Sequence, residues 1–534
     1  MKKYKIYSLL FLMLMLVNFS CTDQLREDEL ELAEGVSQMT NPAYLLSGSI
    51  VNIATYYQKK GINEDRFNAI MLYYQQLFSV KSQSHEEFTK APENWSSEYK
   101  LLYDAQAGIT KAEEAGLPST AAAQQILQCL MFEYLSDIYG DIPYTEALSG
   151  REGNIKPVFD TQEMIYTGLM KTLDEAVATL GSSSDKIGGD LLYNGDKQSW
   201  IRFANSLKIR MLVRSYDAFG GSKQNELQAA AKALYIEDNT FNAALVYEGT
   251  SSENSWIWGP ANNGEEEMTR RKPSVPFLDL LKANDDPRIL AWIAPALQPW
   301  GYEDATYTLT DYYGDSYQIN MLDSDGENIG GFPIGETYVG APLTVAQLEY
   351  IYGEGSGSGS YDNYKLSSYT NIFIEDANDL LKATLFEASE VSFCLAEAAQ
   401  KGWITGIDAS QYYENGIKQN MRRWDIKESD ISKYLSENLL PLDNNSALVA
   451  ILTEKWKSLF TQGHQSWFEY RRTGIPAVVG DTPDYVSLPF PLRWRYPTYE
   501  VDNNSENANE AVNRLGEDTQ TAKIWIIKGV APVE

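Results

Sequence analysis

Apolar residues recur at the spacing of an α-helix through most of this chain. Within residues 121–141 they fall at 126, 130, 134 and 138, and again at 127, 131 and 135. Two such stripes leave little polar surface, so we expect a largely buried helix that ends at Gly140. A second helix is expected over residues 161–181, with Thr161 or Asp160 as its N-cap.

A third helix is expected over residues 196–215. Its packed face carries Trp200, Phe203, Ala204, Leu207 and Met211, whereas Arg202, Lys208 and Arg210 lie off that face. Residues 387–424 indicate a pair of helices with a turn at Gly402, and the small Ala396 and Ala399 allow close packing. This pairing is typical of tetratricopeptide repeats, but no strict 34-residue period is present, so any repeats are degenerate.

The helical period fades over residues 250–370, where Gly, Ser, Asn, Asp and Tyr dominate and 353–364 is a flexible loop. Six aromatic residues fall within 300–317, and Trp256 and Trp258 lie nearby. Irregular segments on a rigid scaffold commonly carry binding residues. We therefore predict ligand contacts from Trp256, Trp258, Trp300 and Tyr302; the alternative is that these rings only pin the loops to the body.

The first residues predict an export signal and a lipid anchor. Three lysines precede the apolar run 9–17, and the small Ser20 precedes Cys21. We expect residues 1–20 to be removed, Cys21 to be lipidated, and 21–40 to form an acidic, flexible tether. Residues 41–534 are then expected to form one domain, with the loop-rich insertion at about 250–370.

Charge and cysteine content narrow the classes of function. The chain carries a formal net charge of −30, which should repel nucleic acid, so we exclude nucleic-acid binding. Beyond Cys21 there are two cysteines, Cys129 and Cys394, each within an apolar helical run. Two buried thiols are expected rather than one disulfide.

Catalytic and metal-binding patterns are largely missing from the sequence. The two histidines, His85 and His464, have no partner motif and are expected to be structural or on the surface. Residues 320–332 resemble a calcium loop, but aligning Gly326 places Met321 and Phe332 at ligand positions, so an EF-hand is excluded. We expect no cofactor, and an irregular calcium site is the alternative left open.

Eight stretches, in order along the chain, resemble the SusD/RagB family of nutrient-uptake outer-membrane lipoproteins, in its SusD-like branch. Several have a structural interpretation of their own, such as a turn at Asp141 and Pro143, a helix end at Arg471 and Arg472, and a surface turn over 495–504. The stretches are residues 136–148, 157–176, 191–214, 270–289, 338–342, 390–403, 454–474 and 492–512.

The resemblance implies a mainly α, SusD-like fold with tetratricopeptide-like helix pairs and a loop-rich half that binds the ligand. It also implies a surface-exposed, lipid-anchored protein of the outer membrane, without enzymatic activity, that passes oligosaccharide to a SusC-like TonB-dependent transporter. A peptide cargo is the first alternative. A surface-tethered glycoside hydrolase, which needs two carboxylates in one cleft, and a purely structural lipoprotein are the others.

Overall fold

The computed structural model describes residues 41–62, 67–76, 88–262, 271–323, 333–343, 364–406, 408–480 and 488–529. Cys21, the signal and tether segments, His85 and the loop 353–363 lie outside these ranges. None of the helices within them is long and apolar enough to cross a bilayer.

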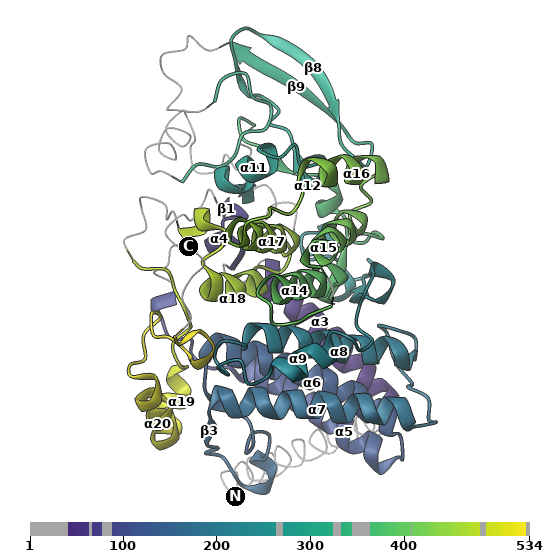
Figure 1. Ribbon diagram of the computed structural model, residues 1–534, viewed down its shortest axis with the longest axis vertical. Helices are drawn as coiled ribbons and strands as arrows, with labels where there is room; N and C mark the ends of the chain where they lie inside the picture. Colours follow the sequence, from purple (N-terminus) through teal and green to yellow (C-terminus); the bar gives the residue numbers. More distant parts are fainter. Residues whose placement is uncertain are drawn as a thin grey trace, which may run out of the picture.

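Long helices form the body of the protein, as the periodicity predicts. Those of its lower part pack as neighbours in sequence order, α5 on α6, α6 on α7 and α7 on α8 (Figure 1). They are α5 (Ser96–Glu114), α6 (Pro118–Tyr139), α7 (Gln162–Ser182), α8 (Lys197–Arg214) and the shorter α9 (Gln224–Ala230). Helix α3 (Pro42–Ile62) packs on α5 and α6, and the short α4 (Phe67–Ile70) packs on a helix of the second group, α18 (Gly463–Thr473). Gly140 follows α6 with φ of 92°, and the Thr161 hydroxyl accepts from the Met164 amide as the cap of α7, as expected.

A second group of helices lies against this body. It comprises α14 (Ala388–Gln400), α15 (Ala409–Arg423), α16 (Glu428–Glu437), α17 (Asn444–Ser458) and α18 (Gly463–Thr473). Helices α14 and α15 form the expected pair, and α14 also packs on α8 and α17. The expected surface turn over 495–504 is wrong in part, because α19 (Thr498–Asn503) occupies most of it; α20 (Ser505–Leu515) follows directly.

The loop-rich part contains two short helices, α11 (Val275–Lys282) and α12 (Arg288–Trp292), and most of the strands. Its largest sheet has the order β7–β9–β8, with β8 and β9 forming the hairpin at the top of Figure 1. These strands are β7 (Trp300–Gly301), β8 (Ala305–Thr310) and β9 (Ser316–Asp323). Four antiparallel pairs tie other segments together: β1 (Tyr74–Gln76) with β5 (Arg271–Pro273), β2 (Ile142–Pro143) with β3 (Phe159–Asp160), β4 (Ala243–Val246) with β11 (Lys382–Phe386), and β6 (Ile293–Ala294) with β10 (Ser368–Tyr369).

The N-terminal segment packs against helices from the far end of the sequence. The Asn68 amide donates to the Phe460 carbonyl at 2.9 Å, and the Tyr73 hydroxyl donates to the Trp456 carbonyl. The Tyr73 and Trp456 rings stack with centroids 4.8 Å apart, and Phe460 contacts rings from both α11 and α12. One aromatic core therefore joins the N-terminal segment, the end of α17 and the loop-rich part.

A network of buried charges links the two helical groups. Arg210 binds both carboxylate oxygens of Glu133 and donates to Glu390 at 3.2 Å. Arg214 donates to Asp137 at 2.5 Å and to Glu469 at 2.9 Å. The expectation that Arg210 lies off the packed face is therefore wrong, since the side chain is 0% exposed and satisfied by charged partners.

Replacing Arg210 should strongly destabilise the fold. The substitution Arg210→Met leaves the buried Glu133 and Glu390 without their main counter-charge, and we expect a loss of about 3–5 kcal/mol in the free energy of unfolding. Lys171→Met is the matched control, because the Lys171–Glu175 pair at 3.6 Å is exposed and should contribute less than about 1 kcal/mol. Urea unfolding measures both, and equal losses would contradict the assignment.

His464 lies at the start of α18 and is fully buried, so its structural role is confirmed. Its ring packs 4.3 Å from Tyr57 and 5.4 Å from Tyr134. Burial lowers the pKa of His464 well below its usual value, and the nearby Arg210 and Arg214 lower it further. The imidazole therefore stays neutral in the folded protein at neutral pH.

The stability should depend on pH through His464. In the unfolded chain this histidine takes up a proton below about pH 6.5, whereas the folded protein keeps it neutral, so the unfolded state binds more protons. The free energy of unfolding should then fall as the pH drops from 7 to 5, with a slope approaching about 1.4 kcal/mol per pH unit. His464→Gln should flatten this dependence. The free energy of unfolding of both proteins is measured with urea at several pH values. An equal pH dependence in the wild type and the variant would contradict the role of His464.

Candidate functional site

Two of the tryptophans predicted to bind ligand belong to the core. Trp256 is 1% exposed and Trp258 is 0% exposed. The Trp258 ring stacks on Tyr369 with centroids 5.8 Å apart, and the Trp256 ring meets Tyr247 edge-on at 6.0 Å. This placement contradicts the expectation that their faces are open for stacking on a ligand. They pin the loop-rich part to the body, which is the alternative that the sequence left open.

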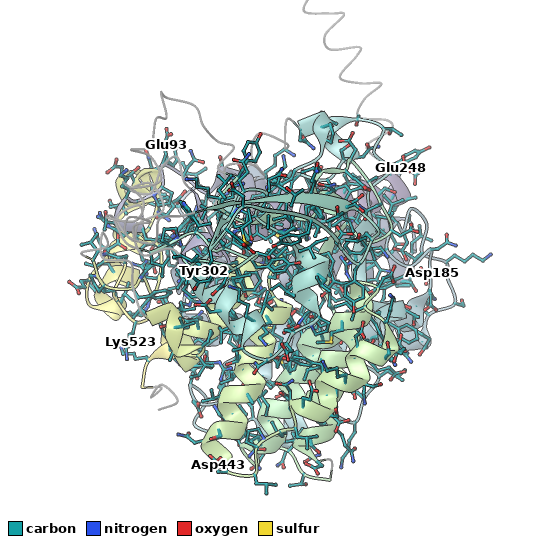
Figure 2. All side chains as sticks on the ribbon, turned by 90° about the horizontal axis from the view of Figure 1, so that it is seen from above. Glu93, Asp185, Glu248, Tyr302, Asp443 and Lys523 are labelled. Atoms are coloured by element: carbon teal, nitrogen blue, oxygen red, sulfur yellow. The ribbon has the colours of Figure 1, made fainter. Side chains whose placement is uncertain are left out.

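Trp300 and Tyr302 lie at the strand β7, and only Tyr302 is open to solvent. Trp300 is 5% exposed, and the ammonium of Lys365 lies 4.3 Å from the centre of its ring. Tyr302 is 79% exposed, with its ring close to Gly335. Figure 2, which views the molecule from the end that carries the β8–β9 hairpin, labels Tyr302 on this face.

A second exposed tyrosine lies beside this strand. Tyr364 is 47% exposed, and its carbonyl accepts from the Gln298 amide at 2.8 Å, two residues before Trp300. We call Tyr302, Tyr364 and Lys365 the tyrosine face. Both tyrosine rings are exposed, and the partly buried Lys365 places its ammonium over the indole of Trp300. Aromatic rings of this kind can stack on a sugar ring or contact an extended peptide.

The β8–β9 hairpin extends from the tyrosine face and exposes an uncharged polar surface. Its outer side chains are Thr306, Thr308, Thr310, Ser316, Gln318 and Asn320, all exposed. They are paired across the hairpin, with Thr306 bonded to Asn320 at 3.2 Å and Thr310 to Ser316 at 3.2 Å. The opposite side of the hairpin, with Tyr307 and Ile319, faces the body. The exposed side therefore offers mainly hydroxyl and amide groups, with the half-exposed Leu322 at the end of β9.

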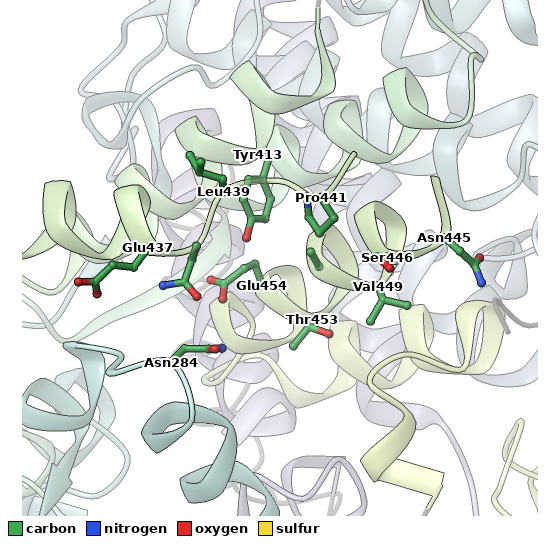
Figure 3. A pocket seen from close by; sticks show the side chains of 12 residues that line it. Asn284, Tyr413, Glu437, Leu439, Pro441, Asn445, Ser446, Val449, Thr453 and Glu454 are labelled. Carbon is green, nitrogen blue, oxygen red and sulfur yellow. The ribbon is translucent and has the colours of Figure 1, made fainter. Parts of the chain in front are cut away.

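A pocket of about 490 Å³ lies among α15, α16 and α17, away from the predicted residues (Figure 3). We call it the helical pocket. Tyr413 and Glu454 form its floor, and Asn284, from the turn after α11, lies at its edge. The residues that line it are Asn284, Tyr413, Glu437, Asn438, Leu439, Pro441, Asn445, Ser446, Val449, Ala450, Thr453 and Glu454. The sequence interpretation missed this pocket, although the unusual run of Leu, Pro and Asn over 438–445 marks one wall.

Glu454, the carboxylate on the floor of the helical pocket, is not suited to act as the general acid of a glycoside hydrolase. Glu454, on the pocket floor, accepts from Tyr434 at 2.7 Å, from Lys457 at 2.8 Å and from Arg288 at 2.7 Å. Burial alone would raise the pKa of Glu454, but Arg288 and Lys457 outweigh it and hold that pKa below its usual value. A carboxylate fixed in the charged form cannot act as a general acid near neutral pH.

The described residues provide neither a cluster of metal ligands nor a reactive thiol at the candidate sites. No group of three metal-ligating side chains occurs within the ranges that the structure describes, and most of the calcium-like loop, residues 324–332, lies outside them. Cys129 and Cys394 are buried free thiols, as expected. Burial raises the pKa of the Cys394 thiol to about 11, which keeps it protonated and unreactive.

Comparison with known proteins agrees with this architecture of a helical body and an aromatic, loop-rich end. A family model described as "Starch-binding associating with outer membrane" matches residues 34–497. The chain therefore belongs to this SusD-like family, a class of outer-membrane-associated, glycan-binding proteins of nutrient uptake. No curated protein sequence matches it.

Solved structures share the fold along nearly the whole chain. A SusD homologue from Bacteroides fragilis NCTC 9343 gives a TM-score of 0.72 at 19% identity, covering 91% of this chain and 100% of its own. A chitin-binding protein gives 0.70 at 21% identity, covering 92% and 100%. A SusD homologue from Bacteroides uniformis ATCC 8492 gives 0.67 at 21% identity, covering 91% and 99%. The mainly α, SusD-like fold expected from the sequence is confirmed.

Trp258 should contribute to stability and not to ligand binding. The substitution Trp258→Ala removes a fully buried ring, and we expect it to lower the free energy of unfolding by about 3–5 kcal/mol. Binding per folded molecule should be unchanged, since the ring has no exposed face. Urea unfolding and titration with ligand at a temperature where the variant is folded measure the two quantities. If Trp258→Ala loses affinity for the ligand while its free energy of unfolding is unchanged, the expectation that Trp258 contacts the ligand would be correct after all.

Proposed function

We propose that this protein binds a neutral oligosaccharide at the tyrosine face and passes it to a SusC-like TonB-dependent transporter. The observation that carries the proposal is the pairing of exposed tyrosine rings with an uncharged polar hairpin. Rings stack on the apolar faces of sugars, and hydroxyl and amide groups bond sugar hydroxyls. The family description, which names starch binding and the outer membrane, supports the same role.

The proposal places the protein at the cell exterior, anchored by lipid at Cys21, and without catalytic activity. The apolar run that ends at Cys21 supports the anchor, and the acids that follow it support surface export. The fixed charge of Glu454 argues against hydrolysis at the helical pocket. Capture without cleavage suits a protein that hands its ligand to a transporter.

A peptide ligand is the second candidate, and one observation favours it. Strand β8 lies at the edge of the β7–β9–β8 sheet, next to the tyrosine face. An exposed edge can accept an extended peptide as a further strand, with main-chain hydrogen bonds giving the affinity. Either kind of ligand would therefore bind at the tyrosine face, and a binding experiment is needed to distinguish the two candidates.

Replacing the exposed tyrosines should weaken binding without affecting stability. We expect Tyr302→Ala and Tyr364→Ala each to lower the affinity for a neutral oligosaccharide tenfold or more, because a ring that stacks on the ligand is lost. The measurement is calorimetric titration with malto-, cello- and chito-oligosaccharides, galacturonate oligomers and extended peptides. Reducing ends are assayed in parallel, and release beyond the amount of protein would contradict a non-enzymatic role.

Tyr44→Ala is the matched control, because Tyr44 is 66% exposed but lies on α3 in the helical body. It should bind as the wild type does. Binding of peptides but of no glycan would favour the second candidate. Unchanged glycan affinity in both tyrosine variants would place the binding site elsewhere.

A further inference from the structure

We infer that the helical pocket is a second sugar-binding site, specific for uncharged sugars and independent of the tyrosine face. The inference rests on the proposed function and adds a second point of contact for the same class of ligand. A pocket of about 490 Å³ lies within the range of small-ligand sites, which is about 300–1,000 Å³. It can hold one or two sugar units, which is far less than a polysaccharide chain.

The polar groups that line the pocket are suited to sugar hydroxyls. Three amides, from Asn284, Asn438 and Asn445, and two hydroxyls, from Ser446 and Thr453, reach the pocket from three different segments. Amides and hydroxyls both donate and accept hydrogen bonds, as sugar hydroxyls do. The set therefore matches a ligand that is rich in hydroxyl groups.

The charges at the pocket exclude anionic sugars. Its lining contains two carboxylates, Glu437 and Glu454, and no lysine or arginine. Lys457 and Arg288 approach Glu454 from its buried side, where they are 0% exposed and bonded within the protein. The charge of Glu454 is offset by these two cations, so a carboxylate on the ligand would find Glu437 and no lysine or arginine in the lining, and uronic acids should be rejected.

One wall of the pocket is apolar and unusually exposed. Leu439 is 69% exposed and Val449 is 36% exposed, and Pro441 and Ala450 line the pocket with them. Pyranose rings carry C–H groups on their faces, and these can cover apolar side chains while the ring hydroxyls reach the amides. The combination of one apolar wall and one amide wall fits an amphipathic ring better than a fully polar ligand.

The floor of the pocket is rigid before any ligand arrives. Glu454 is bonded to Arg288, Lys457 and Tyr434, and Arg288 is bonded to Asn420 at 3.0 Å and to Asp286 at 2.6 Å. Burial, and then the charge of Glu454, raises the pKa of Tyr413 above its usual value, so its hydroxyl stays protonated. In Figure 3 the Tyr413 hydroxyl points towards Glu454 across the floor. A site held this way loses little conformational freedom on binding.

The pocket and the tyrosine face lie on separate parts of the surface. The pocket is built from α15, α16, α17 and the turn at Asn284, whereas the tyrosine face is built from β7 and the segment at Tyr364. In Figure 2, Asp443, which directly precedes α17, lies at the lower edge, far from the label of Tyr302. The two sites can therefore be removed separately by substitution.

The test uses a variant in which the tyrosine face is already disabled. In the double variant Tyr302→Ala/Tyr364→Ala, saturation-transfer NMR is measured with maltose, cellobiose, N,N′-diacetylchitobiose and the anionic digalacturonate. We expect at least one neutral disaccharide to retain saturation transfer, while digalacturonate shows none. Adding Val449→Trp, which fills the pocket from an exposed helix position, should reduce the retained signal fivefold or more.

Val158→Trp is the matched control for the bulky substitution, because Val158 is 38% exposed and lies outside the pocket. It should leave the signal unchanged, and equal melting temperatures show that both tryptophan variants fold. Loss of all signals in the double tyrosine variant, or a retained signal unaffected by Val449→Trp, would overturn this inference but leave the proposed function standing. Binding of digalacturonate at the pocket would overturn its specificity for neutral sugars. Absence of binding of all four sugars to the wild-type protein would overturn both proposals.

Discussion

The packing of the helical body depends on Arg210 and Arg214, two buried arginines whose charges must be balanced by carboxylates inside the protein. Their partners come from α6, α14 and α18, with Glu133 and Asp137 on one side and Glu390 and Glu469 on the other. A buried charge without its partner costs several kcal/mol, so these helices are restricted to the arrangement that brings all the groups together. Lys455 joins through Glu469 at 2.9 Å and extends the constraint to α17.

A second buried ionic cluster fixes the loop-rich part to the helical body in the same way. Asp286 and Arg288, at the start of α12, bond to Glu454 and Lys457 on α17. Burial would raise the pKa of Asp286, but Arg288 and Lys457 hold it down at about 2, so the cluster stays charged over the whole physiological range. The helical pocket is built directly on this cluster, whereas the tyrosine face sits on short strands. The two candidate sites therefore differ in how firmly they are held.

The helices and the candidate sites differ in how far they can be predicted from sequence. Helices α6 and α7 follow from local periodicity and caps, such as Gly140 and Thr161, which act within one turn. The role of Arg210 could not be predicted, because its partner Glu133 lies 77 residues away. Aromatic content located the loop-rich part, but composition does not separate Trp258, which is buried, from Tyr302, which is exposed. The helical pocket joins Asn284 to residues 413–454, and no local pattern spans that distance.

The contact of Asn68 and Tyr73 with the end of α17 has a consequence for the order in which the chain can fold. Asn68 and Tyr73 bond to the carbonyls of Phe460 and Trp456, almost 400 residues further on, so their binding partners do not exist until the C-terminal helices have emerged. Here α4 and Tyr73 cannot complete their packing early, because Phe460 and Trp456 have not yet been made. The order of the sequence therefore leaves this part of the core incomplete until the residues around 456–460 are available to pack.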